Sequence, residues 1–162
     1  MGPAGAGKST VGAYLATALG WRFTDADDFH SAASLARFAR GEGLSDDDRA
    51  PWLGRLAAEI ETALVRGTPM VLACSALRHA YRRALLPTTA AEGDVQFVYL
   101  RVQPATLAAR LAARRGHVAG PALLPSQLAL LEEPSLFEGV ITLDGEQPVE
   151  DLVGQIRHEC GV

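Results

Sequence analysis

With 162 residues, the chain has the length of one domain with a substantial core, and we expect residues 1–162 to form that single domain. Hydrophobic residues make up 48% and charged residues 21% of the chain, which excludes an intrinsically disordered protein. The net charge of -4 argues against nucleic acid as a partner, and no apolar run is long enough for a membrane partner or a secretion signal. The two cysteines indicate neither a disulfide framework nor a metal site, so we expect a cytoplasmic protein.

A glycine-rich loop opens the chain. The stretch MGPAGAGKST fits the pattern G-x-x-x-x-G-K-[ST], so the backbone N–H groups around residues 5–8 are predicted to wrap a nucleotide β-phosphate at the start of a helix. Lys8 is predicted to contact the β- and γ-phosphate oxygens, and the Ser9 hydroxyl to take one position around Mg²⁺. Lys8 is the only lysine among 15 basic residues, which favours this hypothesis over a glycine-rich tail without function.

The residues after the loop predict two helices with a strand between them. The first helix ends at Gly20, and its apolar face consists of Val11, Leu15, Ala18 and Leu19. The stretch WRFTDAD predicts a short strand, and residues 30–49 predict a polar, partly helical segment. A long helix then has Pro51 near its start and Gly67 after its end.

Three apolar runs further along the chain, MVLACSA, VQFVYL and GVITLD, predict parallel strands buried on both faces. Helices are expected over 104–115 and from Pro148, and a lid over 114–125. Strands that alternate with helices indicate an α/β fold with a parallel sheet flanked by helices. Ligands in such sheets bind beyond the carboxyl ends of the strands, which here carry Asp25, Ser75, Arg101 and Asp144.

Acidic residues follow the first predicted strand of the chain, in the stretch DADDFH after WRFT. There, Asp25 and Asp27 are suited to anchoring the water shell of a metal ion and to accepting the proton of an attacking hydroxyl. Aspartates are equally common as turn formers and helix N-caps, and this alternative stays open. We place His30 on the substrate side of the site, with a polar residue at a helix start as its alternative.

Several blocks together resemble the bacterial gluconokinases. In chain order they are GPAGAGKSTVG, DADDFHS, GLSDDDRAPWL, CSALRHAYR, FVYLR, RLAARRGH, LLPSQLALLEEP and LDGEQPVEDLV. The resemblance implies a P-loop NTPase fold of the nucleoside-monophosphate-kinase type with a lid, similar to shikimate kinase. It also implies transfer of the γ-phosphoryl group of ATP to the 6-hydroxyl of D-gluconate with Mg²⁺, and family members are commonly homodimers.

The resemblance assigns roles to individual residues. The ATP phosphates are expected at Gly2, Gly5, Ala6, Gly7, Lys8, Ser9 and Thr10. Asp27 matches the aspartate that orients or deprotonates the acceptor hydroxyl, and Asp25 would be a partner of Mg²⁺. Arg49 and Arg82 are candidates for the gluconate carboxylate, because a planar guanidinium binds a carboxylate bidentately. A salt bridge at the helix start is the alternative for Arg49, and an exposed helix face is the alternative for Arg82.

Further polar residues lie in the matching blocks. Ser75 is placed to donate to a phosphate or a sugar hydroxyl, whereas Cys74 is expected to be a small buried side chain. Arg110 and Arg114 are predicted to clamp the transferring phosphoryl group, unless one of them only extends along its helix. His117 is expected to be a solvated lid residue.

The chain departs from the family pattern at Ser34, Gly43 and Val118, where gluconokinases usually carry asparagine, proline and phenylalanine. These departures bear on substrate affinity and lid closure rather than on the reaction class. Two other functions stay open: a kinase of another small sugar acid or shikimate-like substrate, and a nucleotide-binding homologue without catalysis.

The strand that should precede the loop is missing from this sequence. In the family's strand order it lies in the middle of the sheet, so its absence predicts two half-sheets with unpaired backbone groups, each costing about 1–3 kcal/mol. We therefore expect the natural protein to start upstream, with about five to ten more, mostly apolar, residues.

Overall fold

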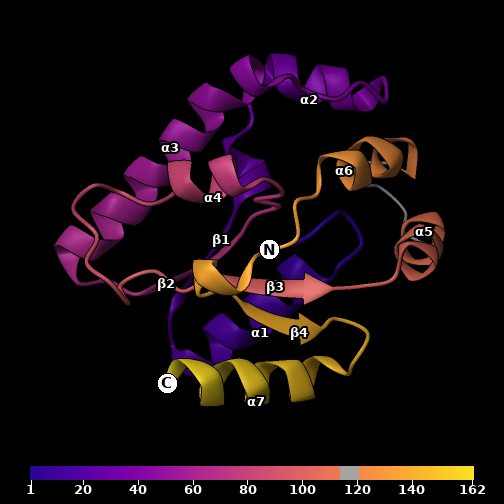
Figure 1. The fold of residues 1–162 in the computed structure, drawn as a ribbon. Coiled ribbons are helices and arrows are strands. Elements are labelled where there is room, and N and C mark those ends of the chain that lie inside the picture. Colours follow the sequence, from indigo (N-terminus) through magenta and orange to yellow (C-terminus); the bar gives the residue numbers. More distant parts are fainter. Residues whose placement is uncertain (114–120) are drawn as a thin grey trace.

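The computed structural model describes residues 1–113 and 121–162, in which strands and helices alternate along the chain (Figure 1). The strands are β1 Arg22–Asp25, β2 Met70–Ala73, β3 Val98–Arg101 and β4 Ile141–Asp144. The helices are α1 Lys8–Leu19, α2 Ala32–Ala39, α3 Asp46–Arg66, α4 His79–Ala84, α5 Pro104–Ala113, α6 Leu124–Leu130 and α7 Val149–Cys160. The 3₁₀ turns are η1 Ala26–Phe29, η2 Pro121–Leu123 and η3 Leu136–Glu138. The predicted α/β class is confirmed.

The strands form two separate parallel pairs. β1 pairs with β2, with Asp25 opposite Ala73, and β3 pairs with β4, with Arg101 opposite Asp144. Among the described residues, no strand pairs with both β2 and β3. The predicted division into two half-sheets is therefore confirmed for this chain.

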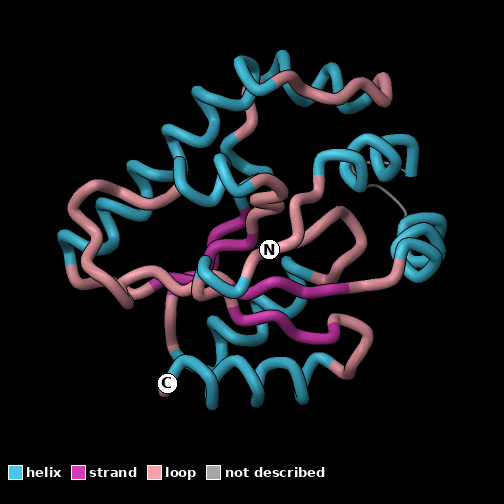
Figure 2. Tube along the Cα trace, in the orientation of Figure 1, coloured by secondary structure: helices cyan, strands magenta, loops and turns pink. Residues whose placement is uncertain are grey.

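Helices cover both faces of the strands (Figure 2). On one face, α1 packs against β1, β2 and α7. Its buried Val11 and Leu15 share a core with Leu152 and Ile156 of α7. On the other face, Leu56 and other residues of α3 form a second core with α4. The site therefore rests on a frame that is packed from both sides.

The helix boundaries follow local signals in the sequence. α1 ends at Gly20, which has a left-handed φ of 67°. At the start of α3, the Ser45 hydroxyl and the Asp48 carboxylate cap each other's backbone N–H groups, which satisfies two donors at the helix end. The expected face of α1 is wrong at one position, because Ala18 is exposed and Ala16 is buried instead.

The expectation that β2 is buried on both faces is also wrong for this chain. Met70, Val71 and Leu72 are only half-buried, and Ala73 alone is fully buried. The reason is that β2 pairs only with β1 among the described strands, so its other side faces a cavity between the two strand pairs.

The lid predicted over 114–125 falls mainly on residues outside the described ranges. Its described part is helical, since η2 Pro121–Leu123 leads directly into α6. Within the described residues, no helix combines the length and apolar character that crossing a membrane requires.

Candidate active site

The glycine-rich loop adopts a conformation that side chains would disfavour. Gly5 and Gly7 have φ angles of 84° and 93°, in the left-handed region that favours glycine. A Cβ atom on Gly5 would also lie 3.1 Å from the carbonyl oxygen of Leu107. Gly7 is the N-cap of α1 and supplies no side-chain acceptor, so the first N–H groups of this helix are left for an anion.

Three side chains hold the loop in this shape. The Lys8 ammonium donates to the Pro3 carbonyl oxygen at 2.9 Å, and the Gln127 side chain accepts from the Ala4 N–H at 2.7 Å. The Arg110 guanidinium donates to the carbonyl oxygens of Gly5 at 3.3 Å and Gly145 at 3.1 Å. Arg110 therefore contacts the back of the loop, whereas the sequence predicted it to clamp the phosphoryl group.

A cavity of about 490 Å³ lies in front of the loop, and most of the predicted site residues line it. From the loop and α1 they are Gly5, Gly7, Lys8, Ser9 and Thr10; from the other elements they are Asp25, Asp27, His30, Arg49 and Ser75. Gly2, Ala6, Arg82 and Arg110 are not in its lining, and Arg114 and His117 lie outside the described residues. The structure thus brings the nucleotide-side and substrate-side predictions together in one cavity.

Asp25 organises the end of β1. Its carboxylate accepts a hydrogen bond from the Ser9 hydroxyl at 2.6 Å and another from the Asp27 N–H at 3.0 Å. The described residues contain no group of three or more His, Cys, Asp or Glu side chains that could hold a metal ion by themselves. The hydroxyl and carboxylate oxygens fit Mg²⁺, which is typically bound by one or two carboxylates together with substrate phosphates.

Asp27 lies next to this pair and is open to the cavity. Its side chain is 64% exposed, and the nearest ring nitrogen, His30 Nε2, is 3.9 Å from the carboxylate. Because its backbone N–H is fixed by Asp25, the carboxylate is oriented while its oxygens stay accessible to a ligand. As an N-terminal residue of a 3₁₀ turn, Asp27 also matches the turn-forming alternative.

His30 is buried in an aromatic wall of the cavity. Its ring stacks on Trp52 with centroids 4.6 Å apart and meets the edge of Phe38 at 4.9 Å. Burial lowers the pKa of His30, so its ring is neutral at pH 7. Among the described residues, its Nδ1 atom has no hydrogen-bond partner, which leaves one buried polar atom for a ligand.

Arg49 lines the same cavity from the first turn of α3. Its Nη1 atom donates to the Leu44 carbonyl oxygen and to the Tyr81 hydroxyl, the latter at 3.3 Å, and its guanidinium lies 5.6 Å from the centre of the Tyr81 ring. The expected helix-start salt bridge is present only as a long contact of 4.0 Å with Asp46. The structure is therefore compatible with both predicted roles of Arg49, a ligand of the substrate carboxylate and a salt-bridge partner at the helix start.

Arg82 is held elsewhere, away from the cavity. Its guanidinium is almost completely buried and forms two hydrogen bonds with the Glu138 carboxylate, at 2.6 and 3.0 Å. It also donates to the carbonyl oxygens of Ala76 and Glu132. The exposed-face alternative for Arg82 is wrong, and the geometry gives no support to a role in binding the substrate carboxylate.

Two further expectations concern the end of β2. Cys74 is buried as expected, and burial raises the pKa of its thiol to about 11. Ser75 lines the cavity, and its carbonyl oxygen accepts from the Gly2 N–H at 3.1 Å. Ser75 therefore lines the cavity in which its hydroxyl is expected to donate to a phosphate or sugar. Its backbone carbonyl oxygen binds the start of the loop.

Sequence reasoning did not single out several residues of the cavity wall. These are Phe38, Trp52, Tyr81 and Gln127. Trp52 belongs to the block GLSDDDRAPWL and Tyr81 to the block CSALRHAYR, so the family resemblance already contained a signal for both residues. The contact between Gln127 and Ala4 spans 123 positions and leaves no local trace in the sequence.

Comparisons with known proteins agree with this geometry. A family described as "AAA domain" matches residues 1–134. "Gluconokinase" of Gluconobacter oxydans is 40% identical over 98% of this chain and 88% of its own length, and "Probable gluconokinase" of Mus musculus is 39% identical over 96% and 92%. A gluconokinase crystal structure from Sinorhizobium meliloti is 36% identical, with a TM-score of 0.83 over 99% of this chain and 89% of that one. A sugar kinase structure from Janibacter is 35% identical, with a TM-score of 0.91 over 100% and 92%.

Replacement of Glu138 by glutamine tests the buried pair with Arg82. The hydrogen bond from Arg82 lowers the pKa of Glu138 from 4.5 to about 2, so the charged carboxylate stabilises the fold above pH 4.5 and this contribution is lost as the pH falls toward 2. We expect Glu138→Gln to reduce the free energy of unfolding by about 3 kcal/mol at pH 7, because it leaves Arg82 buried without its counter-charge. Urea denaturation at pH 7 and pH 3 measures the difference, which should shrink at the lower pH.

The matched control is Glu133→Gln. Glu133 pairs with Arg101 at 3.0 Å, but both side chains are about half exposed, so we expect a loss below about 0.5 kcal/mol. Equal losses for the two variants would contradict the assigned role of the buried pair.

Proposed function

Because this chain belongs to the gluconokinase family, we infer that it transfers the terminal phosphoryl group of ATP to the 6-hydroxyl of D-gluconate. The observation that carries this inference is that the phosphate-binding loop and the Asp27 carboxylate line the same cavity. The donor side and the acceptor side of a phosphoryl transfer must meet at one point, and little else is required of the protein than positioning and charge stabilisation. A cavity of about 490 Å³ has the size of a small-molecule site.

The ATP phosphates are proposed to lie against the first N–H groups of α1. Gly7 offers no competing side-chain cap, and the loop glycines let the backbone approach the ligand closely. Lys8, on the cavity wall, would neutralise charge on the β- and γ-oxygens. Arg110 supports this arrangement from behind by fixing the Gly5 carbonyl group, so we propose that it positions the loop.

Mg²⁺ would be held by the Ser9 hydroxyl and the Asp25 carboxylate, which are already 2.6 Å apart. When bound, the ion would supply charge neutralisation between the β- and γ-phosphates. Asp25 would then keep its second task, since its other oxygen accepts from the Asp27 backbone and so fixes the neighbouring carboxylate.

Asp27 is proposed to accept the proton of the 6-hydroxyl as the oxygen attacks the phosphorus atom. An exposed carboxylate with an oriented backbone can reach a bound hydroxyl without moving the rest of the turn. The gluconate chain would extend toward the aromatic wall, where His30 Nδ1 can bond a hydroxyl group. Arg49 would face the carboxylate of the substrate.

Measurement of ADP release with a panel of acids tests the function directly. We expect turnover with D-gluconate and at least ~100-fold lower kcat/KM with shikimate, since the buried polar groups of the cavity reject ligands that leave them unpaired. Lys8→Ala should lower kcat by about 10²-fold or more through lost charge stabilisation. Asp27→Asn should lower it by about 10²–10⁴-fold through loss of the proton acceptor.

Asp47→Asn is the matched control for Asp27. Asp47 is exposed in the first turn of α3 and does not line the cavity, so its replacement should leave the rate unchanged. Unchanged turnover in both Lys8→Ala and Asp27→Asn would overturn the proposal, as would equal activity with gluconate and shikimate.

His30→Phe tests the substrate side separately. Phenylalanine keeps the contacts with Trp52 and Phe38 but removes the buried Nδ1 atom, so stability should not fall. Loss of one hydrogen bond to the substrate should raise the KM for gluconate by about tenfold while the KM for ATP stays within about twofold. Steady-state kinetics with each substrate varied in turn measure both values, and equal changes in the two KM values would remove His30 from the gluconate site.

A further inference from the structure

The turn between β2 and α4, residues 74–78, contains a strained residue. Ala76 has a φ of 44°, and within the described ranges 1–113 and 121–162 it is the only residue other than glycine with a positive φ. At this angle the Cβ atom of an L-residue comes close to a backbone carbonyl oxygen, so residues other than glycine adopt it rarely. Such a conformation persists only where the surrounding structure fixes it, and it occurs most often at functional sites.

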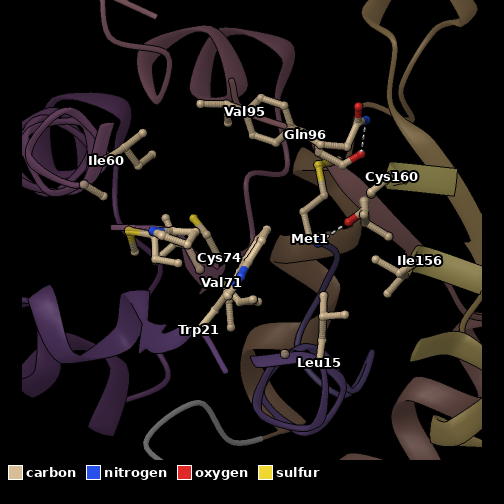
Figure 3. Close-up of a pocket in the computed structure, with 18 of the residues that line it drawn as sticks. Met1, Leu15, Trp21, Ile60, Val71, Cys74, Val95, Gln96, Ile156 and Cys160 are labelled. Carbon is tan, nitrogen blue, oxygen red and sulfur yellow. Dashed lines mark hydrogen bonds between the residues drawn. The ribbon is translucent and has the colours of Figure 1, made fainter. Parts of the chain in front are cut away.

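The β2–α4 turn lies between two different environments. Ser75 and Leu77 line the proposed catalytic cavity. Cys74 and Ala76 are buried and line the apolar cavity between the strand pairs, where Figure 3 shows the Cys74 side chain. The Ser75 carbonyl oxygen accepts from the Gly2 N–H at 3.1 Å, at the start of the phosphate-binding loop. Because this carbonyl group and the Ala76 nitrogen share one peptide plane, a rotation about φ of Ala76 would turn it away from the loop.

Arg82 binds the same turn from the interior of the protein. Its Nη1 atom donates to the carbonyl oxygens of Ala76 at 3.2 Å and Leu77 at 3.4 Å, so two successive carbonyl groups converge on one nitrogen. The same atom donates to the Glu132 carbonyl oxygen at 3.1 Å. The Nε and Nη2 atoms donate to the Glu138 carboxylate at 2.6 and 3.0 Å. The guanidinium, only 3% exposed, is therefore fixed on several sides at once.

The ion pair and the contacts with the turn use different nitrogens of Arg82. Pairing with Glu138 occupies Nε and Nη2, whereas the turn is bonded only by Nη1. A planar guanidinium can serve both partners because its donors point in fixed, separate directions. The two tasks of this side chain can therefore be tested separately.

We propose that Arg82 is a positioning residue, which holds Ala76 in its left-handed conformation and thereby fixes Ser75 between the catalytic cavity and the start of the loop. Arg82 itself does not line that cavity, so it acts through the turn. Its effect on turnover rests on the proposed gluconate kinase function, in which the Ser75 hydroxyl donates to the substrate. Its effect on the turn does not depend on that function.

A double-mutant cycle of Arg82→Lys with Ala76→Gly tests the proposal. A lysine ammonium keeps the charge beside Glu138 but lacks the planar fork that binds the carboxylate and the turn together. Glycine adopts a positive φ without strain, so the turn needs fewer bonds to keep its shape. We expect Arg82→Lys to lower kcat/KM for gluconate about tenfold when position 76 is alanine, and less than about threefold in the Ala76→Gly background.

Amide hydrogen exchange of Gly2 provides a readout that needs no catalysis. Its N–H group is bonded to the Ser75 carbonyl oxygen, so a displaced turn releases it. We expect Arg82→Lys to speed this exchange at least ~10-fold when position 76 is alanine, and less than about threefold in the Ala76→Gly background. A protein that shows this pattern but does not phosphorylate gluconate would keep the positioning role of Arg82 and lose the proposed function.

Glu138→Gln is the control for stability alone. It weakens the ion pair but leaves the Nη1 atom of Arg82 bonded to Ala76 and Leu77. We therefore expect a lower Tm, with kcat/KM for gluconate and exchange at Gly2 within about twofold of the unchanged protein. Equal effects of Arg82→Lys in the two backgrounds would overturn the proposal. So would a Glu138→Gln variant that loses as much kcat/KM as Arg82→Lys.

Discussion

The hydrogen bonds of Met1 and Gly2 link the two half-sheets at the point where the phosphate-binding loop begins. Met1 is bonded to β3 through Val98 and Leu100, and Gly2 is bonded to Ser75 beyond β2. Because the strands of the two half-sheets do not pair with each other, this junction and the packed helices set their relative position. The loop leaves the junction directly, so the proposed position of the ATP phosphates depends on it.

Local charge and burial explain how an acidic chain can bind two anions. The overall charge is -4, but the start of α1, Lys8 and Arg49 give the cavity positive groups on both its nucleotide and its substrate sides. Asp25 and Asp27 line the same cavity, and in the proposed mechanism they serve the metal ion and the acceptor hydroxyl. The aromatic wall around His30 keeps that ring neutral, so it adds a polar atom without a charge.

Local patterns were sufficient for much of the fold and the loop. The apolar runs and the glycine stops at Gly20 and Gly67 predicted the order of the elements, because each signal acts within a few residues. The site needed distant contacts that no local pattern contains. The pairing of Arg82 with Glu138 spans 56 positions and removes this arginine from the cavity, although its sequence neighbourhood suggested a substrate ligand. Likewise, nothing near Arg110 indicated that it contacts the loop from behind.

The hydrogen bonds at Met1 and Gly2 hold the phosphate-binding loop in its position. NMR-detected amide exchange of Gly2 and Leu100, whose N–H groups form the junction, shows whether nucleotide binding and these hydrogen bonds are linked. At an ADP concentration 100 times its Kd, we expect both amides to exchange about 100-fold more slowly, because a nucleotide that binds only the intact loop stabilises the hydrogen-bonded junction by mass action. If ADP shifts the resonances of the loop while Gly2 and Leu100 exchange as fast as before, the loop does not depend on the junction.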